Sequence, residues 1–400
     1  MEERQKSARK TLGDPTINRF WLLSEPMRET CFQRVVLFGA LLVWATGCTN
    51  VVIPYKPTIS EPAPVSLLSS AYVESAETGT VSMFRVSSSG LWTPTQPPSV
   101  GTGQLPESLV VDPSGRFVYV VNARDNTISQ FVIDSATSVL QPNRPALVPT
   151  GAYPQYLAID PSGRFVYSAN SNDGTVSMFA ADAVNGALTP MAPAQVAAGS
   201  PASSPAGIVV DPLDRFVYCS NGDGTIAVFT INSVTGVLSP ASIIAFGSGG
   251  SRGFAPAIDP AGRFLYAPEE GLNQLLVFSI DGATGQLTPA SIPSYSVGME
   301  PASVAIDPAG RYLYVVNRGD GTISQFAIES DGSLAAMPIV DDGGQPWQML
   351  VDPSGQIAYV SNEGTASVSI YKIDSAGQLI MYGSAPAGLG AGGIGIARAQ

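Results

Sequence analysis

A repeated unit constrains this chain more than any other feature of its sequence. The dipeptide Asp-Pro recurs at intervals of 48, 51, 48, 48 and 45 residues, each time in a segment similar to SLVVDPSGRFVYVVN. The aspartates of these dipeptides are Asp112, Asp160, Asp211, Asp259, Asp307 and Asp352. A tyrosine follows each one, and another aromatic residue follows that tyrosine eleven or twelve positions later. Self-similarity with this period indicates a repeat architecture whose units pack against their neighbours.

A seventh unit is split between the two ends of the repeat region. Near the start, Tyr72 and Phe84 are again twelve residues apart, but no Asp-Pro segment precedes them. At the end, GGIGIARA, with Ile394, resembles the first strand of the other units. Pairing of a C-terminal strand over 393–398 with the strand around Tyr72 would complete this unit and close the ring. The sequence therefore predicts an all-β fold, a seven-bladed β-propeller over residues 70–400.

Each unit reads as four strands. The first is short and apolar, Asp-Pro-Ser-Gly after it is typical of a type I turn, and the second strand mostly ends in Asn. A glycine-containing turn leads into an alternating third strand, and a weaker outer strand follows. We expect the repeated tyrosines and phenylalanines to pack between blades. In this topology, the loops before the first strands share one face with the turns between second and third strands.

Composition excludes several classes of function. The net charge of −12 and the pI of about 4.5 argue against a nucleic-acid partner, because an acidic protein repels the phosphate backbone. The chain has no histidine, which is the commonest general base and metal ligand. No pair among its three cysteines has metal-site spacing. We therefore expect neither a metal nor a cofactor, and Cys219 is expected to be a small buried core residue.

The N-terminal segment has the pattern of an export signal. Basic residues precede the short apolar run VVLFGALLVW (residues 35–44), and Ala-Thr-Gly-Cys follows it. The last of these, Cys48, resembles the lipidated cysteine of a lipobox. We expect a helical leader over 1–48, with translation starting at the first residue or at Met27, and a Pro/Ser-rich tether over 49–69. These features predict a propeller anchored by lipid to a membrane of the cell envelope, on its periplasmic or outer face. An uncleaved membrane anchor is the alternative.

Two propeller families resemble this repeat. The Tyr-Val-Val-Asn and Tyr-Val-Ser-Asn segments at 119–122, 314–317 and 359–362 look like the Tyr-Val-Thr-Asn repeats of surface-layer propellers. The whole pattern over 70–400 also resembles the lactonase propellers, which include 6-phosphogluconolactonase and carboxy-muconate cyclase. The resemblance implies a seven-bladed ring. It carries less information about chemistry, since one fold hosts many activities.

Residues that interrupt the repeat on the loop face are the candidates for a site. In the segment YAPEEGLNQLLVF, Glu269 and Glu270 replace ordinary turn residues. Lactonase propellers carry Asn-Glu there, and Glu270 falls on the family's glutamate. Arg252 lies in the loop leading into the same blade, about two positions from the arginine of the family's Gly-Pro-Arg-His, and the histidine is missing. A solvated turn carboxylate is the structural alternative for Glu270.

Two further candidates lie in the following blades. Arg318 matches the arginine of the family's Asn-Arg-Gly-His, with Asp320 in place of the histidine. Trp347 stands where the family has arginine, and its ring could stack on a sugar or plug the channel. By this resemblance, Glu270 would activate water while Arg252 and Arg318 bind the substrate's charge and the developing oxyanion. A surface arginine without function is the alternative for Arg318.

Two functions from different classes remain open at this point. The first is a monomeric, envelope-anchored propeller that binds a sugar-lactone-like small molecule, or an envelope protein, at its top-face channel without turnover. The alternative is a hydrolase of unphosphorylated sugar lactones, since 6-phosphogluconolactone is made in the cytosol and this chain carries an export signal. A dehydrogenase with a bound quinone is a third possibility, weakened by the missing histidines.

Overall fold

All regular structure in the described part of the chain is β-strand. The computed structural model describes residues 35–38, 41–46, 49–54, 67–247 and 254–398. The chain divides into two compact units, Met1–Pro64 and Val65–Gln400.

The first unit contains a small antiparallel sheet of three strands, β1 (Val35–Phe38), β2 (Leu41–Thr46) and β3 (Thr49–Pro54). The helical leader expected from the sequence is therefore wrong for these residues. The segment is rich in valine, which favours strands over helices. Within the described residues, no helix has the length and apolarity needed to cross a membrane. Cys48 lies outside the described residues.

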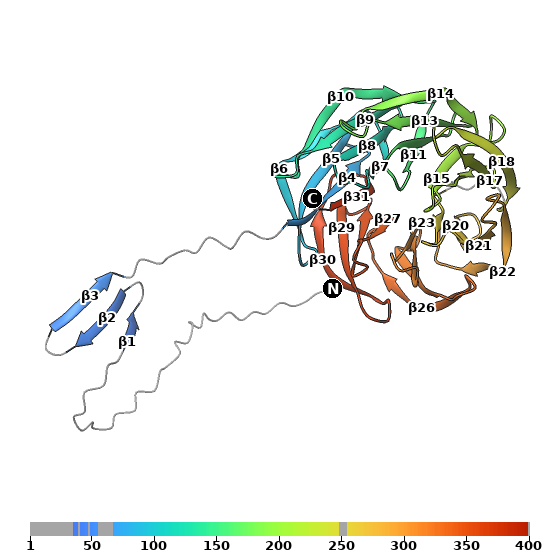
Figure 1. The fold of residues 1–400 in the computed structure, drawn as a ribbon. Helices are drawn as coiled ribbons and strands as arrows, with labels where there is room; N and C mark the ends of the chain where they lie inside the picture. Colours follow the sequence, from blue (N-terminus) through green and yellow to red (C-terminus); the bar gives the residue numbers. More distant parts are fainter. Residues whose placement is uncertain (1–34, 39–40, 47–48, 55–66, 248–253, 399–400) are drawn as a thin grey trace, which may run out of the picture. The chain divides into compact units, whose positions relative to one another are not determined.

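The second unit is a ring of seven four-stranded antiparallel sheets, numbered here as blades 1 to 7 in chain order (Figure 1). The innermost strands of blades 1 to 7 are β31 (Ala391–Arg398), β7 (Pro106–Val111), β11 (Pro154–Ile159), β15 (Pro205–Val210), β19 (Ala257–Ile258), β23 (Pro301–Ile306) and β27 (Pro346–Val351). The second strands are β4 (Leu67–Ser75), β8 (Phe117–Asn122), β12 (Phe165–Asn170), β16 (Phe216–Asn221), β20 (Phe264–Glu269), β24 (Tyr312–Asn317) and β28 (Ile357–Asn362).

The outer half of each blade is more exposed than the inner half. The third strands are β5 (Thr80–Ser87), β9 (Thr127–Ile133), β13 (Thr175–Ala181), β17 (Thr225–Ile231), β21 (Gln274–Ile280), β25 (Thr322–Ile328) and β29 (Ser367–Ile373). The outermost strands are β6 (Trp92–Gly101), β10 (Leu140–Pro149), β14 (Leu188–Ala197), β18 (Leu238–Ala245), β22 (Leu287–Ser296), β26 (Leu334–Asp341) and β30 (Leu379–Pro386). Prolines occur in every one of these edge strands, where a missing N–H interrupts pairing with other chains.

The ring closes as the sequence predicts. The C-terminal strand β31 pairs antiparallel with β4, with Gly395 opposite Tyr72 and Ile394 opposite Val73 (Figure 1). Blade 1 is thus built from both ends of the repeat region. The predicted all-β, seven-bladed propeller with a C-terminal closing strand is confirmed.

The repeated aromatic residues fill the spaces between blades, as expected. Tyr119 and Tyr314 are fully buried, and their hydroxyls donate to the backbone carbonyls of Gly186 and Gly377, both at 2.7 Å. Each of these glycines lies in the outer turn of the next blade. Phe179 packs with Tyr119 in one apolar cluster between blades 2 and 3. Cys219 is likewise buried in the core with a free thiol.

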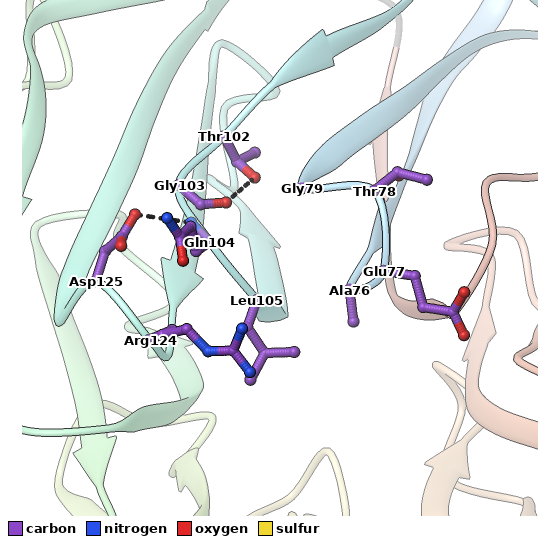
Figure 2. Close-up of a pocket in the computed structure, with 10 residues that line it drawn as sticks. All are labelled: Ala76, Glu77, Thr78, Gly79, Thr102, Gly103, Gln104, Leu105, Arg124 and Asp125. Carbon is purple, nitrogen blue, oxygen red and sulfur yellow. Dashed lines mark hydrogen bonds between the residues drawn. The ribbon is translucent and has the colours of Figure 1, made fainter.

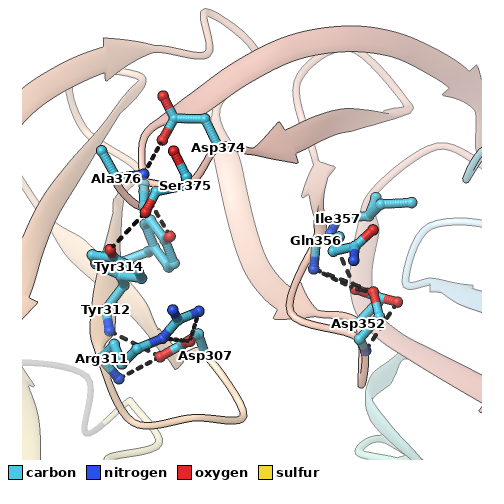
Figure 3. Close-up of polar contacts among 12 residues, drawn as sticks. Asp307, Arg311, Tyr312, Tyr314, Asp352, Gln356, Ile357, Asp374, Ser375 and Ala376 are labelled. Atoms are coloured by element: carbon cyan, nitrogen blue, oxygen red, sulfur yellow. Dashed lines mark hydrogen bonds and ion pairs between the residues drawn. The ribbon is translucent and has the colours of Figure 1, made fainter.

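The Asp-Pro turns repeat one set of polar contacts around the other face (Figure 3). Asp307 is buried, and its Oδ1 accepts hydrogen bonds from the backbone N–H groups of Arg311 at 2.5 Å and Tyr312 at 2.9 Å. The Arg311 guanidinium pairs with Asp307 at 3.3 Å and lies 5.2 Å from the centre of the Tyr312 ring. In blade 7, Asp352 accepts from the backbone of Gln356 and Ile357 in the same way. These repeated contacts stabilise the Asp-Pro turns and hence the fold.

Candidate functional site

A pocket of about 140 Å³ opens where the inner strands begin, at the mouth of the central channel. Its lining comes from the first and the last strands of the propeller and from the loops of blades 1, 2 and 7. The residues are Glu74, Ala76, Leu105, Pro106, Glu107, Trp347, Glu363, Gly390, Ala391 and Gly392. The strand registers shift at the second residue of β7 and of β27, which are Glu107 and Trp347. A β-bulge changes the direction in which a side chain points, and here Glu107 and Trp347 both line the pocket.

Glu74 is the most unusual group in this pocket. It lies at the end of β4 and is only 1% exposed. Its Oε1 accepts a hydrogen bond from the backbone N–H of Gly393, while its Oε2 has no hydrogen-bond partner in the protein. Burial raises the pKa of Glu74 well above 4.5; the Gly393 N–H lowers it, and the charges of Glu107 and Glu363 raise it further. Titratable groups of this kind cluster at functional sites.

The closing strand has the small residues that this carboxyl needs. A Cβ placed on Gly392 would overlap Oε1 of Glu74, and one on Gly393 would lie 3.3 Å from its Cγ. In the other blades, the position equivalent to Glu74 carries an uncharged residue. These residues are Val121, Ala169, Ser220, Pro268, Val316 and Ser361. The glutamate and its paired glycines therefore form a feature of blade 1 alone.

An arginine, a glutamate and a tryptophan form one wall of the mouth. The Arg318 guanidinium donates to Oε2 of Glu363 from Nε at 3.2 Å and from Nη2 at 2.9 Å. Its Cζ lies 5.2 Å from the centre of the Trp347 ring. On its other side, Trp347 meets Phe254 edge-on, with ring centres 5.7 Å apart. The structure thus brings together two residues predicted from sequence, Arg318 and Trp347, and fixes the indole from two directions.

The two consecutive glutamates of blade 5 differ in role. Glu269 stabilises the turn, whereas Glu270 remains a candidate for the site. In five blades the second strand ends in an asparagine whose side chain stabilises the following turn. Asn122, for example, donates a hydrogen bond to the Thr127 hydroxyl at 3.0 Å. Glu269 takes the asparagine's place, is 1% exposed, and accepts from the backbone N–H of Leu272 at 2.5 Å. Glu270 follows it in the turn and is half-buried.

The third member of the predicted catalytic set cannot be placed. Arg252 lies outside the described residues. The convergence predicted for Glu270, Arg252 and Arg318 therefore stays a prediction.

A hydrogen-bonded bridge crosses the channel directly below the pocket. Gln348, the residue after Trp347, donates from Nε2 to the Tyr156 hydroxyl at 3.1 Å. Its Oε1 accepts from the backbone N–H of Ile394 at 2.8 Å. Blades 3 and 7 are not neighbours in the ring, so the contact between Tyr156 and Gln348 must span the central channel. Gln348 and Ile394 lie one and two residues after Trp347 and Gly392, which line the pocket.

A wider hollow of about 400 Å³ adjoins this pocket, and Ala76 and Leu105 line both. Its walls are the turn 76–79 of blade 1, the loop 102–105 before β7, and the turn of blade 2 (Figure 2). Arg124 extends toward Leu105 in Figure 2 and is exposed. These segments confirm that the loops before inner strands share a face with the turns between second and third strands.

The comparisons identify the family of this ring. The family described as lactonase, seven-bladed β-propeller, matches residues 69–204, 190–293 and 290–388. The chain is a member of this family. No curated protein matches the sequence significantly.

Solved structures agree with the fold of this lactonase-family propeller. A protein of Bacteroides uniformis, proposed to be a 6-phosphogluconolactonase, has 22% identity and a TM-score of 0.71; the match covers 83% of this chain and 100% of that one. A similar protein of Bacteroides fragilis gives 20% identity, a TM-score of 0.71, and coverages of 84% and 99%. The periplasmic gluconolactonase of Pseudomonas aeruginosa has 18% identity and a TM-score of 0.68, and the match covers 83% of this chain and 100% of that one. At these identities, the likeness shows the shared fold.

Five residues of this site were missed in the sequence: Glu74, Glu107, Tyr156, Gln348 and Glu363. Glu74 did carry a signal, because it is the only charged residue at its position in the repeat, opposite a Gly-Gly pair. Tyr156 and Gln348 are 192 residues apart, and no periodic pattern connects them. Within the described residues, no group of three His, Cys, Asp or Glu side chains is placed to hold a metal ion.

Proposed function

We propose that the channel-mouth pocket hydrolyses an uncharged sugar lactone, with Glu74 as the group that transfers protons. The observation that carries this proposal is the buried Glu74 carboxyl, which has one oxygen fixed by Gly393 and the other without a partner. Membership of the lactonase family and the fold of a gluconolactonase support the same reaction class.

The proposed reaction adds water across the ring ester. A water molecule gives a proton to the ionised Glu74 as its oxygen bonds to the carbonyl carbon of the lactone. The bond between that carbon and the ring oxygen then breaks, and the ring oxygen takes the proton back from Glu74. The product is an open-chain hydroxy acid, and Glu74 is regenerated. A general base of this kind contributes about 100- to 10,000-fold to a rate.

The charge of the pocket selects the substrate. Three carboxyl groups, of Glu74, Glu107 and Glu363, line it, and the nearby cation Arg318 is already paired with Glu363. A phosphate or carboxylate on the ligand would meet like charges in a partly desolvated site. An uncharged lactone avoids this repulsion, and its hydroxyls offer donors to the carboxylates. The Trp347 ring supplies a flat apolar surface of the kind on which sugar rings stack.

Binding without turnover is the second candidate. Arg318 is held by Glu363, and Trp347 is packed against Phe254, so this wall is preformed for a ligand but offers no unpaired cation to an oxyanion. In this case, the protein would bind a sugar-like ligand at the same mouth. The reaction itself distinguishes the two candidates.

Hydrolysis of glucono-1,5-lactone by the purified protein, with uncatalysed hydrolysis subtracted, tests the proposal. Turnover by the unaltered protein is expected, together with about a 100- to 10,000-fold lower kcat in Glu74→Gln. Glu77→Gln removes the same charge from an exposed position three residues away and should keep the rate. Saturable binding of the lactone without turnover in the unaltered protein would favour the second candidate instead.

We also propose that the propeller is exported and anchored to the cell envelope through a lipid on Cys48. The proposal rests on the basic flank, the apolar run 35–44 and the Ala-Thr-Gly-Cys sequence. An unphosphorylated substrate suits this location, since phosphorylated sugar lactones are made in the cytosol. Mass spectrometry of the native membrane fraction should find an acylated Cys48 as the first residue. A mature protein that begins at another residue would contradict the lipid anchor.

A further inference from the structure

The inner strands place one residue each in a layer that lines the channel just below the pocket. The strand registers define this layer in five blades, where its member pairs opposite the residue two places after the buried tyrosine of the second strand. In blades 1 and 5, alignment of the repeats gives Gly393 and Ala255 as the equivalent residues. Five of its seven members are small: Gly393, Ser108, Gly207, Ala255 and Ser303. The other two are Tyr156 and Gln348.

The two serines of this layer join neighbouring blades. The Oγ of Ser108 accepts from the backbone N–H of Leu157 at 3.4 Å, and that of Ser303 accepts from Met349 at 3.3 Å. Gln348 makes the equivalent contact with Ile394 through its Oε1 at 2.8 Å. The extra reach of Gln348 and the ring of Tyr156 are not needed for that purpose, because serine performs it in two other blades.

The amide of Gln348 determines which way the Tyr156 hydroxyl points. With Oε1 held by Ile394, Nε2 is the end that faces Tyr156, and it donates to the phenolic oxygen at 3.1 Å. An amide nitrogen of this kind cannot accept a proton. The phenolic O–H must therefore donate in another direction. Tyr156 as a whole residue is partly exposed.

Glu74 lies within electrostatic range of this hydroxyl. Burial raises the pKa of Tyr156 to about 12, and the charge of Glu74 raises it while the Gln348 hydrogen bond lowers it. The phenol therefore stays protonated, and remains a donor, up to about pH 12. Trp347 and Gln348 are consecutive in β27, as are Gly392 and Gly393 in β31, so the layer lies one residue below the pocket lining.

We propose that the Tyr156 hydroxyl donates a hydrogen bond to the carbonyl oxygen of the bound lactone and stabilises the negative charge that develops there. Tyr156 is then a catalytic residue, and Gln348 is the positioning residue that directs its proton. This inference rests on the proposed lactone hydrolysis and supplies the oxyanion donor that the paired Arg318 does not. Loss of one such donor typically lowers kcat by about 100- to 1,000-fold.

Kinetics with glucono-1,5-lactone test the inference in the full chain. Tyr156→Phe should lower kcat by about 100- to 1,000-fold with a smaller change in KM, because the donor acts on charge present mainly in the transition state. Gln348→Met keeps the length of the side chain but cannot direct the phenol, and it should lower kcat by roughly 10-fold. Tyr382→Phe, which removes a hydroxyl from an exposed outer strand, is the matched control and should be unchanged.

The outcomes separate this inference from the proposed function. Full activity in Tyr156→Phe, with activity lost in Glu74→Gln, overturns the role of Tyr156 and leaves the hydrolase standing. Absence of turnover in the unaltered protein overturns both. Should Tyr156→Phe fail to fold, Gln348→Met decides: a wild-type kcat overturns the inference, and a loss at unchanged thermal stability supports it.

Discussion

The two faces of the propeller use carboxylates in opposite ways. On the Asp-Pro face, Asp307 accepts two backbone N–H groups and an arginine, and similar contacts recur in other blades. At the channel mouth, Glu74 has one N–H donor and two like charges nearby, and no other blade has such a residue. Repetition therefore marks the residues that hold the ring together, and a departure from it marks a group that the fold does not need.

Electrostatics explains this difference. A buried carboxylate is stable when hydrogen bonds replace its lost hydration, and it favours the neutral form when they do not. For Asp307, two backbone N–H groups and an arginine replace the lost hydration, whereas Glu74 has a single N–H donor. The same chemical group should thus stabilise the protein on one face and destabilise it on the other. The following predictions test that contrast, from the largest expected effect to the smallest.

Deletion of residues 391–400 should have the largest effect. It removes β31, exposes the edge of β4, and takes the donor away from Glu74. Loss of several buried side chains costs several kcal/mol, which corresponds to a melting temperature lower by roughly 10 °C or more. Circular dichroism would follow the melting, with deletion of residues 399–400 alone as the control. An unchanged melting curve would contradict ring closure.

Gly392→Ala should inactivate the site without opening the ring. The added Cβ would overlap Oε1 of Glu74 and push the carboxyl out of place. A shift of about 1 Å in a catalytic group can lower a rate about 100-fold, and we expect that loss in kcat for glucono-1,5-lactone. Gly101→Ala is the matched control, because its Cβ would meet no atom within 4 Å. Equal rates in both variants would show that the position of Glu74 is unimportant.

Asp307→Ala should lower stability and leave turnover unchanged. It removes the acceptor of two partly buried backbone N–H groups, at a cost of about 1–3 kcal/mol in the free energy of unfolding. Urea denaturation measures this loss, and kcat is measured below the transition. A fall in kcat comparable to that of Glu74→Gln would remove the contrast between the faces.

Glu74→Gln should raise stability by an amount that grows with pH. The raised pKa means that the folded state holds the proton after the unfolded chain, with a pKa near 4.5, has released it. The contribution of Glu74 to stability is therefore greatest below that value and is lost as pH rises through the folded-state pKa. Glutamine does not titrate, so the difference in unfolding free energy should be larger at about pH 8 than at about pH 5.

Glu270→Gln should have the smallest effect. Glu270 is half-buried in a turn, and one such charge rarely determines a rate. We expect a change in kcat of less than about threefold, in the range typical of surface substitutions. A loss as large as that of Glu74→Gln would instead assign the base to Glu270, as its alignment with the family's glutamate suggests.

The sequence predicts the ring well because each blade repeats the same local pattern. Asp-Pro turns, buried tyrosines and the pairing of the last strand with Tyr72 all follow from comparing the units with one another. The mouth follows only in part: Arg318 and Trp347 do meet, but the partner of Arg318 is Glu363, which lies in the turn of the next blade.

Two parts of the molecule could not be predicted, for different reasons. The bridge between Tyr156 and Gln348 depends on the diameter of the ring, which no local pattern encodes. The expected leader helix was wrong because an apolar run rich in valine is compatible with either helix or strand, and short runs of this kind carry too little periodicity to decide between them.

The bond between Glu74 and Gly393 joins residues 319 positions apart, in the first and the last strands of the propeller to be made during translation. A chain whose synthesis ends before β31 contains nearly every repeat but lacks the environment of Glu74. Clipping by a protease near the C-terminus would have the same result. Hydrolytic activity would then require the whole propeller, and fragments that still resemble a propeller would be inactive.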